Sequence, residues 1–515
     1  MGSIVAGTLL LTATGLFSQA VGFLYRIALS RLIGAEAMGL YQLVMPVYSV
    51  LMSLTAVGLT VAVSTLTARY HALGDTGAVR LTLRRALGCF LLVAIPLGAV
   101  VVLASDPISV YLMGDARTRL GIALLAPCVL LTGVENLHKH CFYGMGRVGP
   151  PAASETVEQL IRAGAVIALL VLLPARSEEG TVGLIVLGMV LCEVCSATVL
   201  ALLLWRYWQR NPPAPAQGQV RYRRLATTAI PVGLTSLLGT LLGSANAVLI
   251  PARLVAGGAQ ASQAMAQFGV VCGMTLPMLA LPTGFVGALG LVMVPDLARR
   301  TAQGNRQAAA RFLDRAVSAT SLLMAPALAL LTVVGPTLGE LLFREERAGA
   351  FLIPLAVGTL LGCYQGVLSG ALNGLGLQGR GARNAILSDV AQLACTWVLV
   401  PQWGLEGFVL GFVLSALVGA GLNLVCVLRA AKLRARPGAW FARPLLAALF
   451  MGAWCQLFFR ILLRAGCPEG WACALCVLMG LVLYSAALLA QGLSPGDLLT
   501  RRGRAGREGD GRCGS

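Results

Sequence analysis

The sequence predicts an all-α integral membrane protein of about 14 transmembrane helices, built as two six-helix lobes in parallel repeat plus two C-terminal helices. Hydrophobic residues make up 57% of the 515 residues and charged residues only 12%, whereas soluble domains carry about 25% charged residues. Mean hydropathy is +0.81. Apolar runs recur along the whole chain, which leaves no room for a separate soluble domain.

Each of fourteen apolar runs is close to the length of about 20 residues that a helix needs to cross a bilayer. They are residues 4–30, 38–66, 86–104, 119–142, 150–174, 182–205, 225–252, 268–295, 312–334, 349–373, 384–400, 406–428, 441–463 and 471–490. Proline and glycine interrupt many runs, which a bilayer tolerates where neighbouring helices or a cavity satisfy the backbone. The first run lacks a basic segment and a small-residue cleavage site, so we expect a retained helix rather than a signal peptide.

The distribution of Lys and Arg predicts the orientation. With the N-terminus placed inside, 28 of the 39 Lys and Arg residues fall in inside segments and nine in outside segments. The two others, Arg26 and Arg162, lie within predicted spans. This asymmetry supports the helix count and predicts a multi-pass protein with both termini cytosolic. Nucleic acid is a poor explanation for the net charge of +18, because no basic face with interleaved aromatic residues is present.

An internal repeat supports the two lobes. At an offset of 230 residues, ARYHALGDTGAVRLTLRRAL from Ala68 aligns with ARRTAQGNRQAAARFLDRAV from Ala298, and eight of the twenty positions are identical. The same offset pairs Pro96 with Pro326, Gly144 with Gly374 and Gly146 with Gly376. An even number of helices in each unit gives both units one orientation, with a symmetry axis along the membrane normal and a cavity between the lobes.

The repeat divides the chain into five predicted parts. The N-terminal lobe is residues 1–208, and the C-terminal lobe is residues 225–430. Residues 209–224 form a Pro-rich, basic cytosolic linker. Residues 431–492 supply two further helices, and the Gly/Arg-rich residues 493–515 form a disordered cytosolic tail that could contact anionic lipid.

A polar stretch from Glu135 to Arg162 interrupts the apolar sequence and predicts one wall of a central cavity. Its candidate substrate-binding residues are Glu135, Asn136, Lys139, Glu155, Glu158, Gln159 and Arg162. A charge at membrane depth costs roughly 2.5–3.5 kcal/mol on insertion scales, so such residues face a wet cavity or each other. The spacing of Glu158 and Arg162, like that of Glu135 and Lys139, suits an ion pair within one helix. The alternative, strongest near the turn, is that some of these side chains snorkel to headgroups.

Other polar residues complete the predicted cavity. Arg26 from the first helix and Asn246 and Arg253 from the seventh join the first lobe, and Gln365, Asn373 and Asp389 come from the second. The charge is therefore concentrated in the first lobe. A group of Arg and Lys residues in a cavity flanked by lipid is suited to a phosphate or pyrophosphate. The acids either orient these cations or exchange protons.

Motifs for catalysis and metal binding are absent. The sequence has no Walker A loop, no HExxH and no nucleophile elbow, so we expect neither an ATP-driven pump nor an enzyme, and no catalytic residues. Cys192-x-x-Cys195 and Cys473-x-x-Cys476 have the spacing of metal ligands, but each lies in a predicted span without partner ligands. The isolated cluster around His138 and His140 is only weak evidence of a metal site. No metal or cofactor is predicted. Coupling to a Na⁺ or H⁺ gradient or to the membrane potential is left open.

Several motifs together resemble the stage V sporulation protein B family of the multidrug/oligosaccharidyl-lipid/polysaccharide (MOP) flippase superfamily. They are GTLLLTATGLFSQAVGFLYRIALSRLIGAEAMGLYQLVMPVY, LTAVGLTVAVSTLTARYHALGD, FYGMGRVGPPAASETVEQLIR, MTLPMLALPTGFVGALGLVMVPDLARR and YQGVLSGALNGLG. The residues that sit where that family has similar ones are Arg26, Tyr41, Glu158, Gln159, Arg162, Pro277 and Gln365. The resemblance spans most of residues 4–430, and it carries no role over to His138 or His140.

The resemblance implies a flippase of the bacterial cytoplasmic membrane. It would move a polyprenyl-pyrophosphate-linked peptidoglycan precursor, similar to lipid II, or an oligosaccharide across that membrane by alternating access. It also implies a role in spore-cortex or cell-wall synthesis, with the lipid-linked precursor, membrane lipids and cell-wall synthesis proteins as partners. One alternative is a MATE-type multidrug or cation antiporter, which would need an ion-coupling carboxylate such as Asp389 or the pair Glu155 and Glu158. A second is a non-transporting scaffold of the wall-synthesis machinery.

Overall fold

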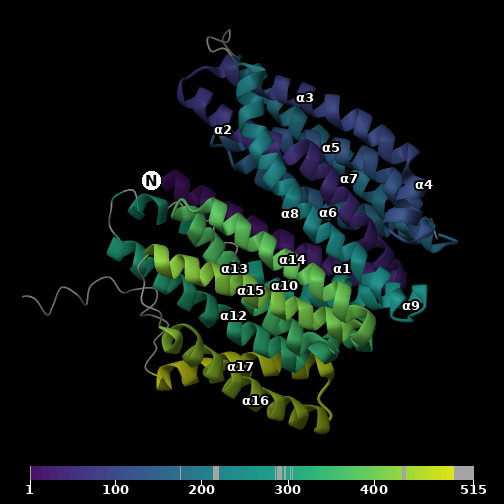
Figure 1. Ribbon diagram of the computed structural model, residues 1–515, viewed down its shortest axis with the longest axis vertical. Coiled ribbons are helices and arrows are strands. Elements are labelled where there is room, and N and C mark those ends of the chain that lie inside the picture. The colour runs from purple at the N-terminus through teal and green to yellow at the C-terminus, as the bar shows by residue number, and fades with distance from the viewer. Residues whose placement is uncertain are drawn as a thin grey trace, which may run out of the picture. The chain divides into compact units, whose positions relative to one another are not determined.

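The computed structural model describes residues 2–491 except 174, 213–219, 285, 287–292, 295–296, 302, 304–305 and 432–435. Every secondary-structure element among these residues is helical (Figure 1), which confirms the predicted all-α class. The predicted tail and the middle of the predicted linker lie outside the described residues.

The described chain divides into two compact units, and the first comprises Met1–Leu281 and Ala385–Gly411. Its helices are α1 (Gly2–Met52), η1 (Ser53–Val57), α2 (Gly58–Ala72), α3 (Thr76–Leu103), α4 (Ser105–Pro107), η2 (Ile108–Leu112), η3 (Ala116–Thr118), α5 (Arg119–Gly144), α6 (Gly149–Leu172), α7 (Glu178–Arg210), α8 (Tyr222–Ala256), α9 (Ala261–Phe268), η4 (Gly269–Thr275) and α10 (Leu276–Ala280). Most of α14 (Gln378–Trp403) and the start of α15 (Leu405–Ala431) also belong to it.

The second unit comprises Pro282–Asn384 and Phe412–Ser515. Besides the rest of α14 and α15, it contains η5 (Leu281–Thr283, from its second residue), α12 (Arg306–Phe343), η6 (Glu346–Gly349), α13 (Leu352–Gly374), η7 (Gly438–Ala442), α16 (Arg443–Arg464) and α17 (Glu469–Ala490). These two units do not coincide with the two six-helix lobes, whose boundaries stay a prediction.

Twelve segments of the described chain are long and apolar enough to cross a membrane. The first of them, Ala13–Ala72, is 60 residues long and contains most of two predicted spans, 4–30 and 38–66. A further helix, α6, is 24 residues long but is not among the twelve, because Glu155, Glu158 and Arg162 lie within it. The long first segment and α6 account for the difference between these twelve segments and the fourteen predicted spans. The count of fourteen stays a prediction.

The loop predicted between the first two spans is replaced in the structure by an interruption of the helix at one residue. Gly34 has φ 75° and ψ −179° inside α1, a backbone region that is essentially restricted to glycine. Helical structure resumes directly after it, so the two predicted helices join with no loop between them.

Helix packing in the first unit positions the polar stretch. Helix α5 packs against α3, α2 and α7, and α6 packs against α7 and α1. The approach of α6 and α7 is close because Gly188 of α7 lies directly against the backbone of Val166, where a Cβ atom would overlap it. The polar faces of α5, α6 and α7 are therefore held next to one another.

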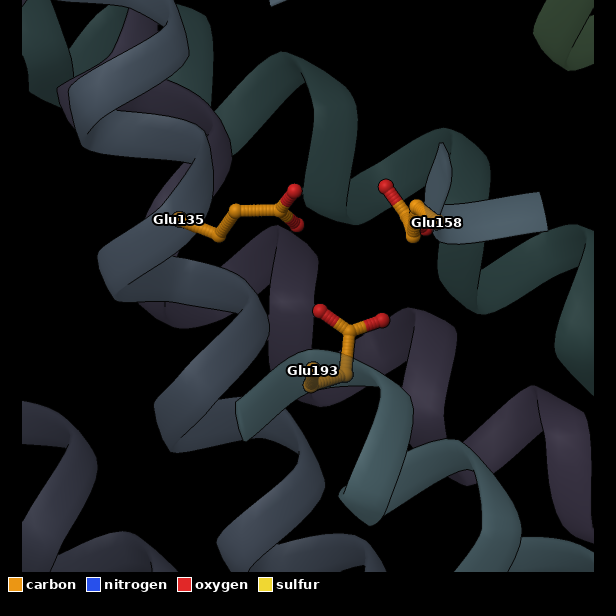
Figure 2. A group of neighbouring side chains, drawn as sticks. All are labelled: Glu135, Glu158 and Glu193. Atoms are coloured by element: carbon orange, nitrogen blue, oxygen red, sulfur yellow. The ribbon is translucent and has the colours of Figure 1, made fainter. Parts of the chain in front are cut away.

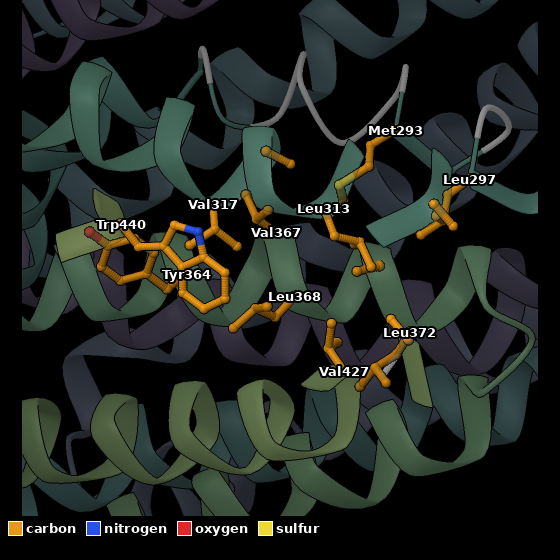
Figure 3. Close-up of a cluster of buried hydrophobic side chains, with 14 of the residues drawn as sticks. Met293, Leu297, Leu313, Val317, Tyr364, Val367, Leu368, Leu372, Val427 and Trp440 are labelled. Atoms are coloured by element: carbon orange, nitrogen blue, oxygen red, sulfur yellow. The ribbon is translucent and has the colours of Figure 1, made fainter. Parts of the chain in front are cut away.

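The second unit is organised around an apolar core that includes Met293, Leu313, Tyr364, Leu368 and Trp440 (Figure 3). The Trp440 side chain is 1% exposed, and its Nε1 donates to Asp314 Oδ1 of α12 at 2.6 Å. This interaction fixes the segment that leads into α16 and α17, and both of those helices pack on α12.

The cysteines that had metal-like spacing have other surroundings in the structure. Cys473 and Cys476 lie in an apolar cluster between α12, α16 and α17. Cys192 donates from Sγ to the carbonyl oxygen of Glu158 at 3.2 Å, and Cys195 is exposed. Neither pair belongs to a group of metal-ligating side chains within the described part of the chain.

We expect Gly34→Ala to lower the free energy of unfolding by about 1–3 kcal/mol, because an alanine cannot adopt this backbone conformation without strain. A Cβ at Gly34 would meet nothing within 4 Å, so the effect would come from the backbone. Thermal unfolding in detergent measures it. Gly15→Ala is the matched control, since its Cβ would also meet open space and its position lies in regular helix. Equal unfolding temperatures for the two variants would contradict this account.

Candidate functional site

Three helices of the first unit bring five ionisable side chains together. Helix α5 supplies Glu135 and Lys139, α6 supplies Glu158 and Arg162, and α7 supplies Glu193. Oxygens of the three carboxylates lie within 4.8 Å of one another, and Figure 2 shows the carboxylates pointing toward a common centre. We call these five residues the charge cluster.

Ion pairs link all members of the charge cluster. Lys139 Nζ lies 3.0 Å from Glu135 Oε1 and 2.9 Å from Glu158 Oε2. Arg162 Nη2 pairs with Glu158 Oε1 and lies 3.2 Å from Glu193 Oε1. The two contacts within a helix are the pairs that the sequence spacing suggested, whereas the two contacts between helices were not predicted. Glu158 accepts from both cations and is the central member.

Two serines extend the network on its α7 side. Ser196 Oγ donates to Glu135 Oε1, and it lies 3.1 Å from Ser154 Oγ of α6. Sequence reasoning missed both Glu193 and Ser196. The available signal was that Glu193 is the one charged residue in the apolar run 182–205, and an ionisable residue at membrane depth marks a functional candidate.

Arg162 is the most accessible member of the charge cluster. Its side chain is 24% exposed, whereas those of Glu135, Lys139, Glu158 and Glu193 are at most 9% exposed. Its guanidinium is planar and presents several N–H donors, a geometry that matches carboxylates and phosphates. Arg162 can therefore exchange a carboxylate partner for an anion that reaches it, while Lys139 is held between two carboxylates.

Each carboxylate of the charge cluster has at least one cationic side chain as a partner. Although three such groups could hold a cation, each already pairs with Lys139 or Arg162. The positive charge at their centre is thus provided by the protein.

The remaining residues of the polar stretch lie beside the charge cluster. Glu155 accepts a hydrogen bond from Tyr143 Oη at 3.4 Å and has no ion pair among the described residues. Asn136 and Gln159 are half-buried. The alternative that these residues snorkel to headgroups does not apply to Glu135, whose side chain is 1% exposed.

The two histidines have local roles in the structure. His138 is buried, and its Nδ1 lies 2.7 Å from the Val134 carbonyl oxygen one turn earlier in α5. His140 packs edge-on against Tyr143, with ring centroids 5.7 Å apart. His140 Nδ1 is buried and has no hydrogen-bond partner among the described residues.

Arg26 lines a separate pocket of about 430 Å³ in the first unit. Gln19 and Gln42 of α1 are its other polar residues, and Pro277 and Leu276 of α10 form part of the opposite wall. Gln19 Nε2 donates to the Ala280 carbonyl oxygen at 2.8 Å across this pocket. Arg26 is therefore a second cation that borders open space.

Asn246 and Arg253 of α8 make their contacts with α14. Thr396 Oγ1 donates to Asn246 Oδ1 at 2.7 Å, and the Arg253 guanidinium lies 4.1 Å from the ring centroid of Trp397. The sequence placed both residues with the other cavity candidates, but the structure pairs them with α14 and not with the charge cluster. Their spacing along α8 could not indicate which helix they contact.

Of the second-lobe candidates, Gln365 joins a chain of hydrogen bonds with Asn423 and Asn384, and Asn384 also accepts from Arg383 Nη2 at 3.4 Å. Asn384 Nδ2 donates to Asn423 Oδ1 at 3.0 Å, and Asn423 Nδ2 donates to the Gln365 carbonyl oxygen at 3.1 Å. Asn373 is exposed, and Asp389 is half-buried on the part of α14 that belongs to the first unit. Among the described residues, the buried ion pairs are therefore those of the charge cluster.

We expect Lys139→Met to lower the free energy of unfolding by about 3–5 kcal/mol, because it leaves Glu135 and part of Glu158 buried without their cation. The matched control is Arg119→Met, which removes a pair with Asp106 at 3.5 Å whose side chains are 60% and 66% exposed. An exposed pair contributes about 0–1 kcal/mol. Thermal unfolding in detergent measures both, and a loss for Lys139→Met no larger than the control's would show that the pairing is not structural.

The family model described as "Polysaccharide biosynthesis protein" matches residues 4–299. Stage V sporulation protein B of Bacillus subtilis (strain 168) is 25% identical over 441 residues, which are 83% of each protein. The solved structure of the lipid II flippase MurJ in an inward closed conformation has a TM-score of 0.69 at 12% identity, over 96% of this chain and 100% of that one.

A second solved structure is the inward-facing conformation of a multidrug resistance MATE family transporter of the MOP superfamily. Its TM-score is 0.62 at 17% identity, over 80% of this chain and 96% of that one. The fold is thus the one found in MOP-superfamily proteins, and the chain is a multi-pass membrane protein. The relatives are a sporulation protein, a flippase and a transporter, in keeping with the prediction that this chain is not an enzyme. Because the family model covers more than half of the sequence, the chain belongs to the polysaccharide biosynthesis protein family.

Proposed function

We propose that this protein is a flippase that moves a polyprenyl-pyrophosphate-linked glycan precursor across the cytoplasmic membrane. The observation that carries the proposal is Arg162, a partly exposed guanidinium held by Glu158 and Glu193. Its helix packs against α7, which is long and apolar enough to cross a membrane. A pyrophosphate matches this donor group in charge and geometry. Membership of the polysaccharide biosynthesis protein family supports a glycan as the rest of the head group.

The chemistry of such a substrate agrees with the distribution of charge in the first unit. A polyprenyl tail remains in lipid, while the charged head needs polar surroundings during its passage. Arg26 borders a pocket with Gln19 and Gln42, so it supplies a second site at which a phosphate or sugar could be held. Rocking of the two predicted lobes would expose the head group to the two sides alternately.

Similarity to Stage V sporulation protein B supports a peptidoglycan precursor similar to lipid II as the substrate, for spore-cortex or cell-wall synthesis. In this proposal the precursor is taken up on the cytosolic side, with both termini on that side. Membrane lipids and cell-wall synthesis proteins are the other partners, and an ion gradient or the membrane potential supplies the driving force.

We expect Arg162→Ala to slow the translocation of lipid II in reconstituted vesicles by at least about 30-fold, which corresponds to the loss of about 2 kcal/mol of interaction with a buried charge. Arg162→Lys keeps the charge without the planar fork and should give an intermediate rate. Arg119→Ala is the matched control, and its pair with Asp106 is exposed.

Unfolding temperatures distinguish a loss of transport from a loss of folding in these variants. If Arg162→Lys folds like the wild type and both Arg162 variants transport lipid II at the wild-type rate, the proposed role of Arg162 is wrong.

The second candidate function is a MATE-type multidrug or cation antiporter, and the fold similarity to a MATE family transporter favours it. An antiporter needs a carboxylate that couples to an ion. We expect Asp389→Asn to leave lipid II transport within about twofold of wild type, since Asp389 has no ion pair among the described residues and an isolated change away from the site has a small effect. Uptake of a cationic dye that depends on an ion gradient and is lost in Asp389→Asn would instead support the antiporter.

A further inference from the structure

Glu193 is the least satisfied carboxylate of the charge cluster. Its side chain is 1% exposed and its Oε1 lies 3.2 Å from Arg162 Nη2. Its Oε2 is buried and has no hydrogen-bond partner in the described part of the chain. Buried polar atoms are nearly always hydrogen-bonded, so this oxygen requires a ligand that the protein's own donors do not supply.

The balance of charge indicates what that ligand is. The charge cluster contains three carboxylates and two cations, Lys139 and Arg162, so it carries one excess negative charge when every member is ionised. A net charge within the membrane interior is strongly unfavourable. One bound proton removes the excess charge. If the proton is on Glu193 Oε2, this oxygen becomes a neutral hydroxyl that lies next to other carboxylate oxygens.

The groups that face Glu193 come from three other helices and its own. They are Glu135 and Cys128 of α5, Glu158 and Arg162 of α6, Tyr48 of α1, and Cys192 of α7. Arg162 is the cation among these groups, and Lys139, the other cation of the charge cluster, pairs with Glu135 and Glu158. Glu193 therefore depends on Arg162 alone for electrostatic compensation.

We propose that Glu193 is a proton-binding site that controls how firmly Arg162 is held within the charge cluster. With Glu193 ionised, Arg162 is shared by two carboxylates, Glu158 and Glu193. With Glu193 protonated, one of these ion pairs becomes a weaker hydrogen bond to a neutral group, because charge-assisted bonds are roughly twice as strong as neutral ones. Arg162 is then freer to bind a diphosphate. The significance of this switch for transport rests on the proposed function, whereas the proton site itself does not.

The first experiment detects the proton without any substrate. Infrared difference spectroscopy of the purified protein in H₂O and D₂O should show a carboxylic acid C=O band at neutral pH that is absent in Glu193→Gln. Glu179→Gln, in the first turn of the same helix, is the matched control and should keep the band. A band that persists in Glu193→Gln, its absence from the wild type, or its removal by NaCl would each overturn the proposal, the last by showing that Na⁺ occupies the site.

The second experiment measures the effect on Arg162 with farnesyl diphosphate as the probe, bound to protein in detergent micelles. Wild-type affinity should rise as the pH falls through the range in which the infrared band of Glu193 appears, by at most about tenfold per unit, the limit for one titrating group, and should level off once that band is complete. Glu193→Gln should bind farnesyl diphosphate as tightly as the protonated wild type does. Its affinity should lack the part of the pH dependence that comes from Glu193. The probe's own titration is common to both proteins, so their difference isolates Glu193, and identical pH profiles would overturn the proposal.

The two experiments separate this inference from the proposed function. If Arg162→Ala binds farnesyl diphosphate as the wild type does, the proposed function fails, and the infrared band still decides whether Glu193 holds a proton. If the band is absent but Arg162→Ala abolishes binding, the proton site is wrong and the diphosphate-binding role of Arg162 stands.

Discussion

The electrostatic cost of placing ions between membrane-spanning helices is the constraint on which this structure depends. Glu135, Lys139 and Glu158 are almost fully buried, and removing a single partner from such a set is strongly unfavourable. The protein meets the cost by giving each cation two carboxylates, so that no cation is left without compensation. The helices α5, α6 and α7 are thereby tied to one another by charge as well as by apolar contact.

Close helix packing makes this compensation possible. Salt bridges between side chains on different helices need short separations, and Gly188 lets α7 lie directly against α6. Ser196 and Ser154 fill the remaining space with hydroxyl groups that hydrogen-bond rather than with bulk. The same packing leaves Arg162 as the member at the edge of the cluster, which is why the site's exposed chemistry is that of a guanidinium.

The charge in the described residues is distributed unevenly, and this has a consequence for transport. The first unit carries the charge cluster and Arg26, whereas Asn384, Asn423 and Gln365 of the second unit are linked by hydrogen bonds between amide groups. An internal repeat therefore supports two different polar surfaces. A head group that carries both a pyrophosphate and sugars offers two kinds of polar chemistry, and this asymmetry is consistent with such a substrate.

The sequence by itself determined the features that depend on neighbouring positions. Hydropathy located most of the spans to within a few residues, and a spacing of four residues identified the pairs Glu135–Lys139 and Glu158–Arg162, because side chains four apart lie on one face of a helix. Tertiary structure decided the rest. Glu193 joins Arg162 across two helices, Asn246 and Arg253 turn to α14, and Gly34 replaces a loop with a single glycine break. Each of these depends on the angle and distance between helices or on one backbone dihedral, and residue spacing along a chain carries no information about either.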